Sequence, residues 1–438
     1  MITVKGVTPI DGISAFRRLF SCKKNKKIIC KALKRSLLVS LWFVFLTFPI
    51  MVIKVNPVER TVSWRWGNIF YVAIGSFVIS LLAKAWLVRK ERLAARQQAA
   101  ACPARDSIIH DLLQRPGYRY PLIILFSGVA LVFPHLFSTY QANIMTTALM
   151  YIVLGLGLNI VVGVAGLLDL GYVAFYAIGA YSYALLNLHF HLGFWAALPI
   201  GGLLAALFGV LLGFPVLRLR GDYLAIVTLG FGEIIRLILE NWNAFSKGPS
   251  GISNIPRPGF FGVEMSLDQA MIYMYYLMIG LVILTIFVVN RLQHSRLGRA
   301  WLALREDEIA CQAMGIDKTR IKLTAFALGA FWAGLIGVIF AAKTTFVNPA
   351  SFTFMESAII LAIVVLGGMG SIVGVILGAL ILILLPEYLR ALSEYRMLAF
   401  GAILVAMMIF KPEGLIAGVR RTYCFQGRKN AAALQDDE

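Results

Sequence analysis

Long uninterrupted runs of apolar residues alternate with short polar connections along most of the chain. The runs hold roughly 17–24 residues, the length that an α-helix needs to cross a hydrocarbon core of ~30 Å. Several runs carry no charge on any face, which favours a lipid environment over the core of a soluble domain. The pattern predicts crossings at 37–53, 69–88, 121–139, 142–163, 166–188, 194–217, 222–241, 271–290, 323–342, 356–371, 372–389 and 397–411.

Two pairs of runs leave the number of crossings open. A Val-Ala-Gly connection alone separates 142–163 from 166–188, and 356–371 abuts 372–389 at Gly-Gly-Met-Gly-Ser. Each pair is compatible with two crossings and a tight turn, or with one crossing beside a broken or re-entrant piece. The predicted fold class is therefore an all-α polytopic membrane protein with about 10–12 transmembrane helices.

The composition agrees with this pattern and explains the positive charge. Of 438 residues 59% are hydrophobic and 14% charged, against about 45–50% and about 25% in soluble domains. The formal net charge is +19, but its Lys and Arg residues lie in loops and tails, as the positive-inside rule expects, so no nucleic-acid partner is predicted. The basic segments 1–36, 89–119, 291–322 and the tail from Lys411 are assigned to the cytoplasm, together with both termini.

A charged stretch interrupts the apolar pattern inside the predicted cytoplasmic loop 291–322. Residues 300–315, AWLALREDEIACQAMG, contain good helix formers and end at a glycine that suits a C-terminal cap. Helical spacing places Trp301, Leu304, Glu308, Cys311 and Gly315 along one stripe, with Ala310, Ala313 and Met314 beside it. One interpretation is a solvated helix joining two crossings. The other is a helix that docks in a groove on a cytoplasmic partner, where small residues permit close approach.

The same stretch resembles the cytoplasmic coupling loop of ABC importer permeases, through Glu308, Ala310 and Gly315. Four further segments, 155–181, 218–236, 366–379 and 411–415, resemble the LivM family, a permease subunit of branched-chain amino-acid ABC importers. The resemblance covers about residues 121–416. It implies a type II-like ABC importer permease core there, an N-terminal extension with two transmembrane helices in 1–120, and a cytoplasmic tail in 417–438.

The resemblance also implies a function, partners and a location. The chain would be a permease subunit for leucine, isoleucine and valine in the bacterial inner membrane. Its partners would be a LivH-like permease, two cytoplasmic ABC ATPases (LivG- and LivF-like) and a periplasmic binding protein. The implied coupling residues are Arg305, Glu306, Asp307, Glu308, Ala310 and Gly315. The chain has no GxxxxGK[ST] phosphate loop and no nucleophile–base constellation, so neither enzymatic activity nor a cofactor is predicted.

Charged residues within the predicted crossings are candidates for the solute path. Glu233, Arg236 and Glu240 share one face of the run 222–241, and Glu233 lies about 16 Å into the membrane at ~1.5 Å per residue. The pair Glu233–Arg236 is interpreted either as a structural lock between helices or subunits, or as part of the translocation path. Asp169, beside the break between two crossings, is interpreted as the cap of a helix that begins near residue 168.

Two alternative functions stay open. An ion-coupled secondary transporter would use acids at membrane depth, such as Glu233 or Asp169, together with broken helices. The same importer architecture with another cargo, such as urea, amides or a sugar, is also compatible with the sequence.

Overall fold

The computed structural model describes scattered residues between 34 and 80, residues 128, 130–216, 219, 221–259 and 266–388, and scattered residues between 401 and 416. The chain divides into two units, Met1–Leu112 with Cys424–Glu438, and Leu113–Tyr423. The boundaries predicted at residues 120 and 416 stay a prediction. Parts of the predicted crossings 37–53, 69–88, 121–139 and 397–411 lie outside the described residues.

The first unit contains a β-hairpin and two helical segments joined by hydroxyl side chains. Strands β1 (Ile53–Asn56) and β2 (Thr61–Trp64) pair antiparallel in the connection between the first two predicted crossings. The Ser80 hydroxyl donates to Ser36 Oγ at 3.2 Å, and Ser40 donates to the Ala73 carbonyl at 2.8 Å. Such small polar contacts are typical of helix pairs in membranes, where apolar burial alone does not drive association.

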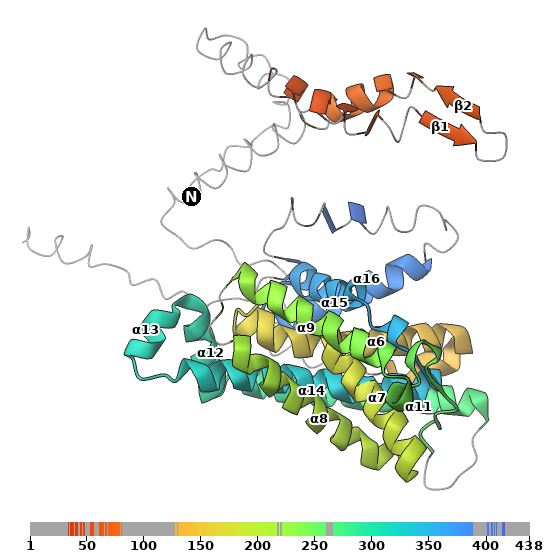
Figure 1. Cartoon of the computed structure of the whole chain (residues 1–438), viewed down its shortest axis with the longest axis vertical. Coiled ribbons are helices and arrows are strands. Elements are labelled where there is room, and N and C mark those ends of the chain that lie inside the picture. Colours follow the sequence, from red (N-terminus) through yellow and green to blue (C-terminus); the bar gives the residue numbers. More distant parts are fainter. Residues whose placement is uncertain are drawn as a thin grey trace, which may run out of the picture. The chain divides into compact units, whose positions relative to one another are not determined.

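The second unit is a helical bundle with short strands in its connections (Figure 1). Among the described residues, its helices with complete bounds are α6 (Thr139–Leu158), α7 (Val173–Phe190), α8 (Phe194–Val216), α9 (Asp222–Asn241), α10 (Asn243–Ser246), α11 (Leu267–Gln293), α12 (Arg296–Glu306), α13 (Glu308–Ala313), α14 (Lys318–Thr344), α15 (Phe354–Gly367) and α16 (Ile372–Tyr388). The π-helix η1 (Asn159–Val164) continues α6. The remaining elements are the 3₁₀ turns η2 (Gly248–Ser250) and η3 (Pro349–Ser351) and the antiparallel strands β3 (Ile252–Ser253) and β4 (Phe346–Val347).

Five helical stretches among the described residues are long and apolar enough to cross a membrane, which confirms the predicted all-α membrane fold. Two of them form the centre of the bundle, because Thr139–Val164 is 83% buried and Lys318–Thr344 is 78% buried over their most apolar windows. The other three stretches are only 33–39% buried and therefore present wide apolar faces outward. The total number of crossings stays a prediction.

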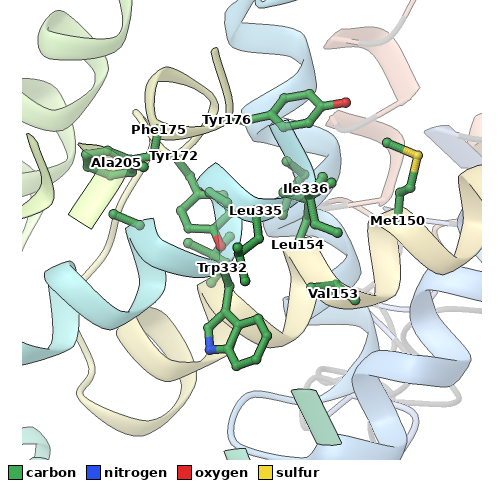
Figure 2. Packing of buried hydrophobic residues seen from close by; sticks show 14 of the residues in the cluster. Met150, Val153, Leu154, Tyr172, Phe175, Tyr176, Ala205, Trp332, Leu335 and Ile336 are labelled. Carbon is green, nitrogen blue, oxygen red and sulfur yellow. The ribbon is translucent and has the colours of Figure 1, made fainter. Parts of the chain in front are cut away.

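Helix α14 is packed tightly against its neighbours because glycines remove side chains from the contact. A Cβ atom on Gly179 of α7 would lie 2.1 Å from the carbonyl oxygen of Gly334 in α14, so only glycine permits this approach. Side chains from α6, α7, α8 and α14 meet in this core (Figure 2). The labelled residues are Met150, Val153, Leu154, Tyr172, Phe175, Tyr176, Ala205, Trp332, Leu335 and Ile336.

The first ambiguous pair of runs is one long helix followed by a break. Thr139–Val164 is continuous, residues 165–172 are not helical, and α7 begins only at Val173. The Tyr172 hydroxyl donates to the Gly329 carbonyl at 3.0 Å, and Gly329 lies about 16 Å along α14 from its first residue at ~1.5 Å per residue. Helix α7 therefore begins deep within the bundle, at membrane depth.

The second ambiguous pair is two short helices joined by a tight turn. Helices α15 and α16 contain 14 and 17 residues, and Ser371 N donates to the Gly368 carbonyl at 3.1 Å. Gly368 and Gly370 adopt φ values of 110° and 87°, which side-chain-bearing residues rarely reach.

Candidate functional site

Two helices, α12 and α13, replace the single helix that the sequence predicts over residues 300–315, and they project at one end of the bundle (Figure 1). The break falls at Asp307, whose backbone is extended at φ −153° and ψ 113°. Its Oδ1 accepts hydrogen bonds from Ile309 N at 2.8 Å and Ala310 N at 3.1 Å. The prediction of one continuous helix is wrong because Asp307 acts as an N-cap, a position that aspartate favours over the helix interior.

The predicted stripe of residues mostly faces the bundle rather than solvent. Trp301, Leu304 and Cys311 are buried, and Trp301 Nε1 donates to the Ile321 carbonyl at 2.9 Å. Gly315 is the exposed member of the stripe, and its φ of 80° confirms the predicted helix end. The stripe therefore anchors α12 and α13 on the first turn of α14.

Glu308 takes part in this anchoring through a buried ion pair. Its Oε1 lies 2.5 Å from Nζ of Lys322 in α14, and the two side chains are only 15% and 3% exposed. A pair with so little solvent contact holds its two elements together, because either charge alone would be expensive to bury. Lys322 was not among the residues predicted from the sequence, although a lysine directly ahead of the apolar run 323–342 signals the need for a partner.

The outward face of α13 is made of small and apolar side chains. Ile309 and Met314 are 68% and 81% exposed. Between them lie Ala310 and Ala313, both exposed. This face is thus a small-residue platform flanked by two large apolar side chains, a shape that fits a groove on another protein. Glu306 and Asp307 are also exposed, at the junction of the two helices.

Arg305 differs from its charged neighbours because it points into the bundle. Its Nη1 donates to the Gly163 carbonyl at the end of η1, and it is only partly exposed. Gly166, at φ 73°, leaves the space that the side chain occupies, since a Cβ there would lie 2.7 Å from Arg305 Cγ. The coupling residues named from the sequence are therefore divided: Arg305 and Glu308 contact the bundle, whereas the other four are exposed.

A second charged cluster lies along α9. Arg236 Nε is 2.8 Å from Glu233 Oε2, and Arg236 Nη1 is 2.8 Å from Glu240 Oε2. All three side chains are partly exposed, beside the face that α9 buries through Leu224, Ala225, Thr228, Gly232 and Leu239. Two carboxylates share one guanidinium, so the cluster retains a net negative charge that hydrocarbon would not tolerate. Water or another protein must therefore cover this side of α9.

Asp169 lies in the non-helical segment 165–172 and is buried. Its Oδ1 accepts from Gly171 N at 2.9 Å, and Oδ2 has no hydrogen-bond partner among the described residues. The N-cap position of α7 is Tyr172, so the interpretation of Asp169 as a helix cap is wrong. It stabilises the turn ahead of α7 instead.

Two further backbone donors, one in this segment and one at the first residue of α7, are also paired with side chains. Leu170 N donates to Thr228 Oγ1 and Val173 N to Ser357 Oγ, each at 3.0 Å. Non-helical backbone at membrane depth needs such partners because no water is there to replace them.

These features define a multi-pass membrane protein with a polar helical projection and a broken helix in its core. The chain belongs to the family of permease components of branched-chain amino acid transport systems, which matches residues 140–410. It is a permease subunit of that family, and the resemblance to LivM is confirmed.

Named relatives span most of the chain. It is 52% identical over 312 residues to the high-affinity branched-chain amino acid transport system permease protein LivM of Salmonella typhimurium, covering 67% of this chain and 73% of that protein. Identity to LivM of Escherichia coli is 47% over 379 residues, covering 82% and 87%. The permease protein LivH of Salmonella typhimurium is 24% identical over 301 residues, covering 64% and 95%. No solved structure matches the chain.

Proposed function

We propose that this permease subunit forms the translocation path of an ATP-driven importer for leucine, isoleucine and valine, together with a second, LivH-like permease. The family and the names of its relatives support this cargo. Two cytoplasmic ABC ATPases and a periplasmic binding protein complete the transporter, which lies in the bacterial inner membrane. Both termini of this chain face the cytoplasm, because the basic loops do.

The outward face of α13 is the docking surface for one ATPase, and this face is the observation that carries the proposal. Ile309 and Met314 enter the ATPase groove, while Ala310 and Ala313 allow its walls to approach closely. The buried Glu308–Lys322 pair makes α13 move with α14. ATP-driven movement of the ATPase is thereby transmitted to α14, one of the two helices at the centre of the bundle.

The charged face of α9 lies along the solute path or against the second permease. A zwitterionic amino acid carries an ammonium and a carboxylate, and the cluster of Glu233, Arg236 and Glu240 offers partners for both. At the end of the bundle opposite to α12 and α13, two contacts hold the loop 247–259. Strand β3 pairs with β4, and the Tyr183 hydroxyl donates to the Pro256 carbonyl at 2.8 Å. This loop is the docking edge for the binding protein.

The docking assignment is tested by Ala310→Trp, with Ala310→Ser as the matched control. Ala310 is exposed and helical, so the indole fits the isolated subunit but fills the space that the ATPase needs. Gly315 is a poorer test position, because a tryptophan at its φ of 80° would strain the backbone. We expect normal insertion of both variants, and loss of ATPase retention or of hydrolysis-coupled uptake in Ala310→Trp alone. Wild-type coupling in Ala310→Trp would contradict the assignment.

The alternatives give different results in the same vesicles. An ion-coupled transporter using Asp169 or Glu233 would stop when the ion gradient is collapsed while ATP remains. An importer for urea, amides or a sugar would accumulate those solutes and leave leucine outside.

A further inference from the structure

The ends of α12, η1 and α11 and the turn between α15 and α16 meet around Arg305. The side chain comes from the last turn of α12, and its Nη1 donates to the carbonyl of Gly163, at the end of η1. The turn between α15 and α16 closes the group, because Gly370 N donates to Asn159 Oδ1 at 2.8 Å. Gln293, at the end of α11, donates from Nε2 to the Gly370 carbonyl at 3.4 Å.

The glycines of this site are needed for the contacts themselves. A Cβ on Gly163 would lie 1.9 Å from Asn159 Oδ1 and 2.5 Å from Gly370 N. A Cβ on Gly166 would lie 2.7 Å from Arg305 Cγ. Side chains at either position would push the α15–α16 turn or Arg305 away, so the close contact depends on both glycines.

The carbonyl that Arg305 binds lies at a helix end of unusual geometry. Ala165 N donates to the Ile160 carbonyl at 3.1 Å, and Leu167 N donates to the Val161 carbonyl at 3.0 Å. A helix C-terminus carries partial negative charge, which favours a cation there, and π-helical turns recur where helices bend for function. Arg305 therefore binds the end of η1 by both charge and hydrogen bonding.

The segment that follows Gly166 connects this site to α9. Leu170 N donates to Thr228 Oγ1 at 3.0 Å, and a Cβ on Gly171 would lie 2.0 Å from the Thr228 carbonyl. Gly171 also lies against Gly232, the residue before Glu233, since a Cβ on Gly232 would lie 3.2 Å from Gly171 Cα. A continuous series of contacts thus runs from the docking helices to the charged face of α9.

We propose that Arg305 is a positioning residue that transmits movement of the docking helices through residues 165–172 to α9. The inference rests on the proposed docking of α13 on an ATPase, but it assigns Arg305 to transmission rather than to docking. Glu308 and Lys322 couple α13 to α14, whereas Arg305 couples α12 to the broken segment and to α9. Movement of α12 that displaces Arg305 releases the Gly163 carbonyl and frees residues 165–172 to shift.

The test compares Arg305→Met and Arg305→Lys with Arg299→Met in the complete transporter. Arg299 lies on the same helix and its side chain is exposed rather than directed at η1. Arg299→Met therefore removes the same charge as Arg305→Met and leaves the contact with η1 in place. We expect Arg305→Met to keep ATPase retention and hydrolysis but to lose about 10-fold or more in uptake per ATP, a size typical of site-to-site coupling. Arg305→Lys, which keeps the charge but not the planar fork, retains part of the coupling, and Arg299→Met retains all of it.

Hydrogen exchange distinguishes transmission from a purely structural role of Arg305, because it measures a change between nucleotide states. Amides of residues 165–172 in the wild-type complex should change protection between the ATP-bound and nucleotide-free states, and Arg305→Met should abolish the difference. Thr228→Val, which removes the acceptor of Leu170 N at the far end of the series, should uncouple in the same way. The double variant should then lose no more than either single variant.

Coupled uptake with an unchanged exchange difference in Arg305→Met would overturn the inference, as would additive losses in the double variant. Failure of the wild-type chain to retain the ATPases would instead contradict the proposed function.

Discussion

The ion pair between Glu308 and Lys322 gives a prediction whose size follows from the structure. Glu308→Gln leaves the Lys322 ammonium, 3% exposed, without its countercharge. Breaking a buried pair from one side costs about 3–5 kcal/mol. Because each 1.4 kcal/mol is tenfold in an equilibrium constant, the lower figure corresponds to roughly 150-fold more frequent opening of the contact between α13 and α14.

The assay is hydrogen exchange at the amides of residues 309–316 in the purified membrane complex. Protection in Glu308→Gln should fall by about two orders of magnitude, the size expected from the loss of a buried ion pair. Glu308→Gln combined with Lys322→Met should recover much of the protection, since two neutral side chains leave no buried charge. Uptake should follow the same order, because α13 can transmit force to α14 only while the two are joined.

A control is available two residues away. Arg320 pairs with Asp317 at 3.1 Å in the same turn of α14, but its side chain is 85% exposed. Such surface pairs contribute about 0–1 kcal/mol, so Arg320→Gln should leave the exchange pattern nearly unchanged. The reasoning is refuted if Arg320→Gln and Glu308→Gln have equal effects, or if the double variant is no better protected than Glu308→Gln.

Two further predictions concern the cap and the charged face. Asp307→Ala should destabilise α13 by about 1 kcal/mol, seen as faster exchange at Ile309 and Ala310, whereas Asp307→Asn should retain most of the protection; equal exchange in both variants would show that the cap is unimportant. Glu233→Gln combined with Arg236→Met should reduce uptake more than recovery of the assembled complex if the cluster lines the path, because it removes charges that the solute contacts. Equal reduction of uptake and of complex recovery would assign the pair to subunit assembly.

The sequence predicts the helices of the bundle well where each lies in one uninterrupted apolar run. The predicted crossing 222–241 coincides with α9, and 194–217 differs from α8 by one residue. The sequence indicated a break near Val-Ala-Gly, but it could not show that the break extends over residues 165–172, because its backbone partners Thr228 and Ser357 are distant in the sequence. Local propensity carries no information about such distant contacts. A polar side chain near an apolar run does indicate that this side chain needs a hydrogen-bond or ion-pair partner.

The coupling residues show the same limit more sharply. Their location in a polar loop followed from the charge pattern, but the direction of each side chain did not. Arg305 turns toward the bundle because the Gly163 carbonyl accepts its hydrogen bond and Gly166 leaves space for its side chain. Glu308 turns toward the bundle because it pairs with Lys322. The cap at Asp307 could have been found, because aspartate ahead of Glu-Ile-Ala is a helix-start signal.

The central claim is that this subunit transports only as part of an ATP-driven complex. The most direct measurement is uptake of radiolabelled leucine into membrane vesicles that contain this chain, with and without the LivH-like permease, the ATPases and the binding protein. We predict uptake that requires ATP and every component and that persists when ion gradients are collapsed. Uptake by this chain alone, driven by an ion gradient, would contradict the account.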